Sequence, residues 1–456
     1  MSGYPISLSA LSVSAGKSLP HGLTELRGTN FTDGTSSPAS GTIRFLDFLN
    51  KSIVNAPTVY PAHLHASYPA TFDEFGSSIS ISGNYAIAGA QFADPGGRSS
   101  AGAAYIFERT STSWVQRAIL IPPDSTASDY FGRSVSISGD YAIVGASGAD
   151  PNGISRAGAA YIFKRSGSYW YQEAKLVASD RAASDQFGDS VSISSTRAVI
   201  GAPSEDPSGV NGAGSAYIFV RSGTTWSQQA KLVASDKDVY DQFGYSVSIS
   251  GDYVIVGAFR EDPSGVTNAG SAYIFVRSGT TWSQQAKLVA SDKAASDQFG
   301  RRVSISGGFA IIGAPSADPN GISSAGAAYV FVRSGTTWSQ QAKLVASDKA
   351  ASDTFGLSVA ISSTGYTIVG ATGADPNGIS GAGAAYIFKR SGSYWYQEAK
   401  LISPNISSHD YFGTSVSIDG DRAVASAPLE YVNSIRGGGG YVFKRNANGT
   451  WSNLTG

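Results

Sequence analysis

The 456-residue sequence predicts an all-β fold: a closed, seven-bladed β-propeller of four-stranded antiparallel blades, preceded by a short N-terminal arm. Three observations predict this fold. A unit of about 56 residues recurs seven times, each unit contains four short segments with the composition of strands, and the two ends of the repeated region hold complementary parts of one unit. A fixed period of this size is the signature of a solenoid, a propeller or an array.

The repeat is marked by the dipeptide Phe-Gly, whose spacing is 56 residues five times and then 57. The units start near residues 75, 131, 187, 243, 299, 355 and 412. An aspartate, a tyrosine, an arginine and a tryptophan keep the same phase in every unit. In the second unit we expect structural roles for the repeat positions Asp129, Phe131, Gly132, Tyr161 and Arg165.

Each unit predicts four strands, which in the fourth unit cover residues 245–250, 253–258, 271–277 and 282–290. These segments are short and rich in β-branched and aromatic residues, as in an antiparallel propeller blade. The run YVIVGA suits an inner strand buried on both faces, and the alternating TWSQQAKLVA suits an outer strand with one face in water.

The two ends of the repeated region predict that the ring closes. The chain ends about halfway through its last outer strand, and residues 62–76 align with residues 286–300 of a complete unit. We therefore expect residues 61–74 to complete the seventh blade as a clasp, because ring closure removes the open edges of a row of blades. The predicted division is an arm over residues 1–60 and a propeller over residues 61–456.

Composition excludes several classes of function. Lys and Arg total 33 against 34 Asp and Glu, so no basic field exists to attract nucleic acid. Cysteine is absent, which excludes disulfides and cysteine-type zinc sites. The N-terminus lacks the basic and apolar regions of a Sec signal peptide, and no stretch of about 18 apolar residues occurs. We expect neither a signal peptide nor insertion into a membrane.

The units FGYSVSISGDYVIVGA and FGRRVSISGGFAIIGAP resemble FG-GAP repeats, which begin with Phe-Gly and end with Gly-Ala-Pro. That family includes the propellers of integrin α-subunits and many surface proteins, and the resemblance covers residues 62–456. It implies a propeller and a role in adhesion. It does not fix the ligand, since propellers host many unrelated functions.

Many blades of this family hold calcium in the loop between their first two strands, and calcium needs six to eight oxygen ligands. Here that loop shrinks to short turns such as Ser250-Gly251-Asp252, and the richest copy is Asp419-Gly420-Asp421. One or two carboxylates cannot build such a site. We therefore expect no calcium and no other cofactor.

Two sets of acidic residues recur. An aspartate stands two residues before every Phe-Gly. The seven aspartates could form a ring that binds cations, or each could shape a turn and face the arginine of its repeat. The presence of the aspartate in every unit favours the turn. The second set is the turn Asp-Pro-x-Gly between the second and third strands, as at residues 150–153. By analogy with integrin-like propellers, these loops and the links between units share one face, which usually meets partners.

Aromatic residues offer a candidate ligand site. A tryptophan in each outer strand either packs between blades or binds a ligand. Two of these tryptophans stand between tyrosines, and alternation along a strand would place each tryptophan on one face and its tyrosines on the other. Exposed aromatic pairs can stack on sugar rings. The candidate glycan-binding residues are Tyr169, Trp170, Tyr171, Tyr394, Trp395 and Tyr396.

Nothing in the sequence predicts catalysis. No nucleophile elbow, HExxH motif or P-loop occurs, and nearly every polar residue is a repeat position, whereas an active site needs unique polar residues that converge. His63 and His65 lie two apart on one strand face, but two ligands are too few for a closed metal site. We interpret them as surface residues of the clasp, and we expect no enzyme.

The arm supplies the functional hypothesis. Its segments ISLSALSVSAGKS, GLTELRGTNF and GTIRFLDFLNKS resemble N-terminal attachment segments of tail-fibre and virion proteins. Residues 1–60 would then bind a protein partner in a larger assembly, and the propeller would be displayed as a binding head for a cell-surface glycan or protein. The hypothesis is a structural or adhesion protein, extracellular or on a virion surface. The alternative is a free, lectin-like propeller that binds glycans.

Overall fold

The structure is a computed structural model, which describes residues 26–31, 39–43, 59–60, 63–111 and 113–453. The chain divides into two compact units, residues 1–53 and residues 54–456. In the first unit, strands β1 (Leu26–Phe31) and β2 (Ala39–Ile43) form an antiparallel pair. The second unit is the propeller.

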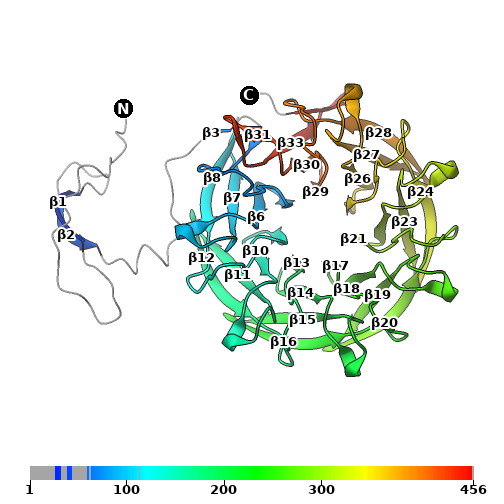
Figure 1. Ribbon diagram of the computed structural model, residues 1–456, viewed down its shortest axis with the longest axis horizontal. Coiled ribbons are helices and arrows are strands. Elements are labelled where there is room, and N and C mark those ends of the chain that lie inside the picture. The colour runs from blue at the N-terminus through cyan, green and yellow to red at the C-terminus, as the bar shows by residue number, and fades with distance from the viewer. Residues whose placement is uncertain (1–25, 32–38, 44–58, 61–62, 112, 454–456) are drawn as a thin grey trace. The chain divides into compact units, whose positions relative to one another are not determined.

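The described residues from 59 onwards form seven antiparallel sheets arranged in a ring, which confirms the predicted seven-bladed propeller (Figure 1). Each blade runs from a first strand at the central channel to a fourth strand at the outside. The first strands of neighbouring blades contact one another around the channel. These innermost strands are β5 (Ser78–Ser82), β9 (Val135–Ser138), β13 (Ser190–Ser194), β17 (Ser246–Ser250), β21 (Arg302–Ser306), β25 (Ser358–Ile361) and β29 (Val416–Asp419).

The next two strands of each blade are almost wholly buried at their centres. The second strands are β6 (Tyr85–Ala90), β10 (Tyr141–Ala146), β14 (Arg197–Ala202), β18 (Tyr253–Ala258), β22 (Phe309–Ala314), β26 (Tyr366–Ala371) and β30 (Arg422–Ala427). The third strands are β7 (Ala103–Arg109), β11 (Ala159–Ser166), β15 (Ser215–Ser222), β19 (Ser271–Ser278), β23 (Ala327–Ser334), β27 (Ala384–Ser391) and β33 (Gly439–Arg445).

The outer strands of the second to sixth blades begin with an exposed residue, a covered tryptophan and a second exposed residue. They are β8 (Trp114–Leu120), β12 (Tyr169–Leu176), β16 (Thr225–Leu232), β20 (Thr281–Leu288), β24 (Thr337–Leu344), β28 (Tyr394–Leu401) and β34 (Trp451–Asn453). Third and fourth strands pair with a register shift in the first six blades, as between Ile162 and Phe163.

The hydrophobic core lies between blades, so that each blade is buried only when it has neighbours. Ile87, Ala104 and Ile106 of the first blade pack with Phe131 and Val135 of the second in one cluster. Such clusters follow one another around the ring. This packing explains why the unit repeats, because a single blade cannot bury both of its faces.

Serine hydroxyls join the innermost strands of neighbouring blades. An innermost strand is the edge of its own sheet, and its outward N–H groups need acceptors. The hydroxyls of one blade accept hydrogen bonds from the backbone N–H groups of the next, as from Val135 to Ser78 at 3.0 Å and from Ile137 to Ser80 at 3.3 Å. We call this set the serine belt; its acceptors are Ser78, Ser80, Ser82, Ser134, Ser136, Ser138, Ser192, Ser246, Ser248, Ser250, Ser304, Ser415 and Ser417.

The belt continues across the junction of the last and first blades. The Ile79 N–H donates to Ser415 Oγ at 3.0 Å, and the Ile81 N–H donates to Ser417 Oγ at 3.2 Å. These bonds join residues 336 positions apart in the chain. The ring is therefore closed at its centre by the same contact that joins its other blades.

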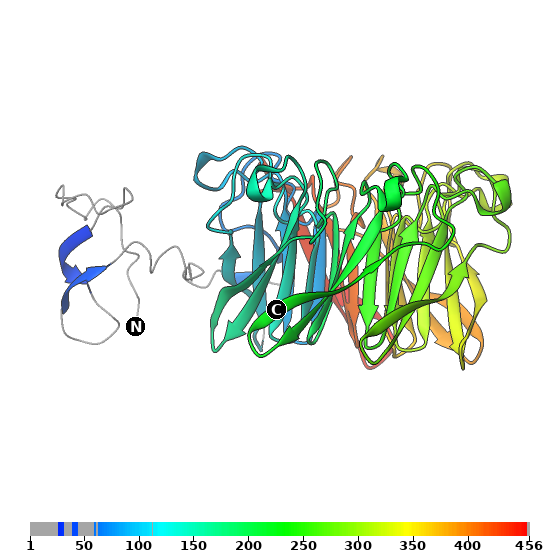
Figure 2. The same cartoon turned by 90° about the horizontal axis from the view of Figure 1, so that it is seen from below.

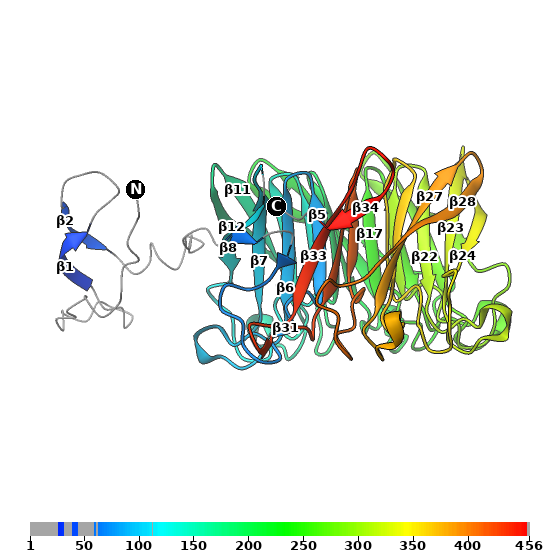
Figure 3. The same ribbon diagram turned by 90° about the horizontal axis from the view of Figure 1, so that it is seen from above.

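Both chain ends contribute to the outer rim at this junction, where β33 and β34 lie beside the first blade (Figure 3). Strand β4 (His63–Leu64) pairs with one part of β33, and β34 pairs with another part. Strand β3 (Val59–Tyr60) pairs with β8 of the first blade, so residues 59 and 60 belong to the propeller although the expected boundary placed them in the arm. Leu64 is fully buried.

We predict that Ser415→Ala lowers the free energy of unfolding by about 1–2 kcal/mol, because the Ile79 N–H loses its acceptor at the closing junction. Urea and thermal unfolding measure the change. The matched control is Ser283→Ala in the outer strand β20, where the serine is exposed. Equal stabilities of the two variants would show that the belt does not hold the ring closed.

Candidate functional site

One face of the propeller carries both the loops between second and third strands and the links between blades (Figure 2). The two kinds of loop touch, since the Phe187 N–H in the link donates to the Ala157 carbonyl in the loop at 3.0 Å. Six of these loops contain a short 3-10 turn from the Asp-Pro-x-Gly pattern: η2 (Pro95–Gly97), η3 (Pro151–Gly153), η4 (Pro207–Gly209), η5 (Pro263–Gly265), η6 (Pro319–Gly321) and η7 (Pro376–Gly378). We call this surface the loop face.

The aspartate before each Phe-Gly organises the link between blades. Asp129 is buried, and its carboxylate accepts a hydrogen bond from the Thr126 N–H at 2.7 Å. The residues on either side of it, Ser128 and Tyr130, have left-handed backbone conformations with φ of 65° and 56°. The carboxylate therefore fixes a strained loop, as the turn interpretation expects.

The expected contact between this aspartate and the repeat's arginine is wrong. Arg165 hydrogen bonds to Asp140 in the turn between the first two strands, at the opposite end of the blade from Asp129. Arg221, the equivalent arginine of the third blade, forms two hydrogen bonds with the Glu173 carboxylate of the neighbouring blade, both with N···O distances of 2.8 Å. The arginine and the aspartate recur with the same period in the sequence, but in the folded blade they lie at opposite ends of its strands.

The other structural repeat positions of the second blade lie in its core. Phe131 packs against Tyr161 with ring centroids 5.6 Å apart, and both are buried. Gly132 has φ of 95°, and a Cβ there would meet the Ala103 carbonyl oxygen at 2.4 Å. Only glycine fits this position.

The aromatic candidates separate into two environments. Trp170 is 1% exposed, and its ring meets Tyr85 of the preceding blade edge-on with centroids 6.0 Å apart. Trp395 is half-buried and meets Phe309 in the same way. Both tryptophans thus pack between blades. Trp170 is too deeply buried to meet a sugar, whereas Trp395 keeps part of its surface exposed and stays a candidate with its neighbouring tyrosines.

The tyrosines of the two triplets do reach solvent. Tyr169 and Tyr171 on β12 are 54% and 37% exposed, and Tyr394 and Tyr396 on β28 are 77% and 44% exposed. The predicted alternation is therefore present. The two pairs belong to the second and sixth blades, so the fold does not bring them into one site.

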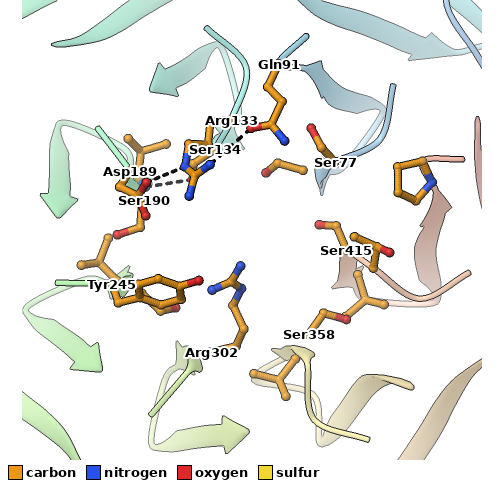
Figure 4. Close-up of a pocket in the computed structure, with 18 of the residues that line it drawn as sticks. Ser77, Gln91, Arg133, Ser134, Asp189, Ser190, Tyr245, Arg302, Ser358 and Ser415 are labelled. Carbon is orange, nitrogen blue, oxygen red and sulfur yellow. Dashed lines mark hydrogen bonds and ion pairs between the residues drawn. The ribbon is translucent and has the colours of Figure 1, made fainter. Parts of the chain in front are cut away.

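A cavity of about 320 Å³ opens where the central channel meets the loop face (Figure 4). The innermost strands line it at their starts, with Arg133, Asp189, Tyr245 and Arg302 among the lining residues. The residue after Phe-Gly differs between most blades: Ser77, Arg133, Asp189, Tyr245, Arg301, Leu357 and Thr414. The following residue is serine in six blades and Arg302 in the fifth.

This cavity was missed by the sequence interpretation, which held that nearly every polar residue repeats. The positions directly after Phe-Gly could have predicted the cavity, because their residues vary between units whose other strands are nearly identical. Residues 213–237 and 269–293, for example, are the same string. A ring fold brings corresponding positions of all blades together at its axis, so variation at one position builds a single asymmetric site.

The two sides of the cavity differ in charge. On one side Arg133 Nε lies 2.5 Å from Asp189 Oδ1, and Gln91 Nε2 donates to Glu74 at 3.1 Å. On the other side Tyr245 lies between two arginines, and the positive charge of Arg302 lowers the pKa of its hydroxyl.

A second group of unique residues lies at the closing junction. Phe72 and Tyr431 are 56% and 57% exposed, and the Arg436 guanidinium lies about 6 Å from the centre of each ring, at 5.9 and 6.0 Å. Here β31 (Tyr431–Val432) and β32 (Ile435–Arg436) replace the Asp-Pro turn of the other blades. We call Phe72, Tyr431 and Arg436 the seam patch.

The two histidines of the clasp lie beside this patch. His63 stacks on Tyr441 with centroids 4.5 Å apart, and its Nε2 lies 3.2 Å from the buried carboxylate of Glu430. Burial lowers the pKa of His65. Within the described residues, no group of three or more His, Cys, Asp or Glu side chains is placed to hold a metal ion.

Comparison with known proteins identifies the repeat. A family model described as the FG-GAP repeat matches residues 60–107, 114–163, 170–219, 226–275, 282–331, 338–388 and 395–443. The comparison with curated proteins gave no significant match. Among solved structures, the crystal structure of Saccharomyces cerevisiae Sqt1 is similar at 11% identity and a TM-score of 0.43, over 88% of this chain and 87% of that one, and this similarity assigns no function. No helix in the described part of the chain is long and apolar enough to cross a membrane.

The buried aspartates predict an unusual dependence of stability on pH. Burial raises the pKa of Asp241 from 3.8 to about 6, so the folded state binds its proton more tightly than the unfolded state does. Its ionised form therefore destabilises the fold above pH 6, by at most about 3 kcal/mol, and this loss is regained as the pH falls towards 4. We expect the stability of Asp241→Asn relative to the natural protein to be highest at pH 7.5 and to decrease towards pH 4.5.

The control is Asp236→Asn. Burial raises the pKa of Asp236, but the hydrogen bonds from Lys287 and Tyr273 outweigh it and hold the pKa below its usual value. This carboxylate stabilises the fold above its unfolded pKa, so the relative stability of the variant should rise as the pH falls. Melting temperatures across this range measure both trends, and parallel trends would contradict the assignment.

Proposed function

We propose a binding role for this chain, which belongs to the FG-GAP repeat family of β-propellers. Propellers of this family are typically non-enzymatic binding folds of the protein-interaction or adhesion type, and they fit extracellular and surface proteins. Our proposal is a non-enzymatic structural or adhesion protein. Its propeller acts as a binding head, and its N-terminal arm fixes that head to a larger assembly.

The observation that carries the proposal is the concentration of unique residues on the loop face. The blades repeat their core and their serine belt, whereas Tyr431 and Arg436 of the seam patch lie in a hairpin that the other blades lack. Phe72 stands beside them, at a position where four of the other six blades have serine. Exposed aromatic residues and arginine are enriched at protein interfaces and dominate their binding energy. The loop face is therefore the surface that we assign to a protein or glycan partner.

The arm is assigned to assembly because the propeller does not need it. The matches to the repeat family begin at residue 60, and residues 1–53 form a unit of their own. A segment that does not match the repeat family can serve to bind another protein. We propose a virion surface or a fibre as the larger assembly, with the propeller on its outside.

A second candidate function rests on the exposed tyrosines of β12 and β28. Tyr169 and Tyr394 are more than half exposed and stand next to a second exposed tyrosine on the same strand. Such pairs offer flat, rigid surfaces on which sugar rings stack. A lectin-like propeller would use them without any assembly through the arm.

We predict that the full-length protein is oligomeric and that residues 54–456 are monomeric. Light scattering after size exclusion measures both masses, and the full-length mass should be a multiple of 47.1 kDa. The truncation keeps β3 and β4, so the closing junction stays intact in the shorter protein. Two monomers would exclude self-assembly through the arm and leave attachment to a different protein.

We predict for the lectin-like alternative that replacing Tyr394 and Tyr396 together by alanine weakens binding to glycans on an array by about tenfold. Both side chains are exposed, so the fold should tolerate the change. The control is Tyr431→Ala, an exposed tyrosine of the loop face. An array without any bound glycan, or equal binding by the two variants, would contradict this alternative.

A further inference from the structure

A cluster of arginines and aromatic rings stands at the mouth of the channel, on the fourth and fifth blades. Tyr245 packs on Phe259 with centroids 4.6 Å apart. The Arg302 guanidinium lies 5.2 Å from the centre of the Tyr245 ring, and the Arg301 and Arg260 guanidinium groups lie 5.2 and 5.4 Å from the centre of the Phe259 ring. We call these five residues the arginine–aromatic cluster.

The three guanidinium groups of this cluster form no direct ion pair within the described part of the chain. Among the described residues, no carboxylate oxygen lies within 4.0 Å of a guanidinium nitrogen of Arg260, Arg301 or Arg302. Their polar contacts are neutral: Arg301 donates to the Gln298 side chain at 3.1 Å, and Arg302 donates to the Arg301 carbonyl at 3.0 Å. Burial lowers the pKa of Arg301, and the neighbouring arginines lower it further. Guanidinium groups held together in this way favour an anion between them.

The cluster replaces the ordinary residues of the repeat. Arg302 stands where the other six blades have serine, so this blade gives up one acceptor position of the belt. Arg260 stands where the other units have Phe92, Gly148, Ser204, Ser316, Gly373 and Leu429. Of the three arginines, Arg302 lines the cavity where corresponding positions of the blades converge, and it points into that cavity (Figure 4).

The size and lining of the cavity restrict the ligand. Its volume of about 320 Å³ lies at the lower end of ligand pockets and suits one sugar ring. Ser134, Ser190, Ser246 and Tyr245 are among its lining residues, next to the Arg133–Asp189 ion pair. The Ser190 hydroxyl already donates to the Gly244 carbonyl, so the hydroxyls of Ser134, Ser246 and Tyr245 are the ones left to donate to a ligand. Hydroxyl groups that line a cavity can form hydrogen bonds with a ligand that has several hydroxyl groups of its own.

We infer that the channel mouth binds an acidic saccharide. Arg302 binds its carboxylate, and Arg301 adds positive charge beside Arg302. The Tyr245 hydroxyl, the serine hydroxyls and the Arg133–Asp189 pair bind its hydroxyl groups. This site is separate from the exposed tyrosines of the outer strands. Binding at this site needs neither the arm nor an assembly, so the test of the site is independent of the test of the proposed anchoring.

Isothermal calorimetry of the full-length protein with glucuronic acid tests the inference. We expect the natural protein to bind it and Arg302→Ser to bind it at least tenfold more weakly. Serine is the residue of the other six blades, so the variant should keep the fold, which its melting temperature verifies. The matched control is Arg156→Ser, which removes an exposed arginine of the loop face outside the cavity. It should bind glucuronic acid as the natural protein does.

Two further titrations separate the chemistry of the ligand. Glucose has the ring without the carboxylate and should not bind measurably, and inorganic sulfate has the charge without the ring and should bind more weakly than glucuronic acid. Absence of binding to glucuronic acid, or equal affinities of the natural protein and Arg302→Ser, overturns the inference. Sulfate that binds more tightly than glucuronic acid also overturns it, in favour of a site for inorganic anions.

Discussion

The structure depends on how the innermost strands satisfy their outward N–H groups. Each is the edge of a four-stranded sheet, and an edge with unpaired backbone groups invites pairing with another chain. The serine belt supplies acceptors from the neighbouring blade, as from Ser78 to Val135. Its spacing of two residues follows the pleat of a strand, so alternate residues enter the core while serines face the channel. Since the acceptor always comes from the preceding blade around the ring, no blade is complete until the ring is closed.

Closure explains why the core of each blade repeats and why the residues that differ between blades gather at the ends of the strands. The belt and the cores between blades recur around the ring, and four tryptophans meet a tyrosine of the preceding blade edge-on. Asp129 and its equivalents hold the links in left-handed conformations that few other interactions would enforce. Because the cores and links of the blades are fixed by these contacts, the residue types at the ends of the strands can differ from blade to blade. The cavity and the seam patch are built at those ends.

The junction between the chain ends departs most from the repeat. Its outer strand is assembled from β4 and β34, its Asp-Pro turn is replaced by a small hairpin, and His63 pairs with Glu430 where other blades have a lysine, as Lys231 with Glu205. These differences place the seam patch next to the point where the ring is closed. The binding that we propose for this patch and the stability of the ring therefore involve neighbouring residues.

The sequence by itself determined the blades, their number, their strands and the alternation of the Tyr-Trp-Tyr triplets, because these follow from local period and composition. It could not determine that Arg165 and Asp129 point to opposite ends of a blade, that Trp170 is buried against Tyr85, or that β3 pairs with β8. Nor could it assemble Arg133, Asp189, Tyr245 and Arg302, which lie at intervals of about 56 residues, into one cavity. A repeat pattern describes the residues that the blades share. Only the closed ring brings the residues that differ between blades together, because corresponding positions of all blades meet around its central channel.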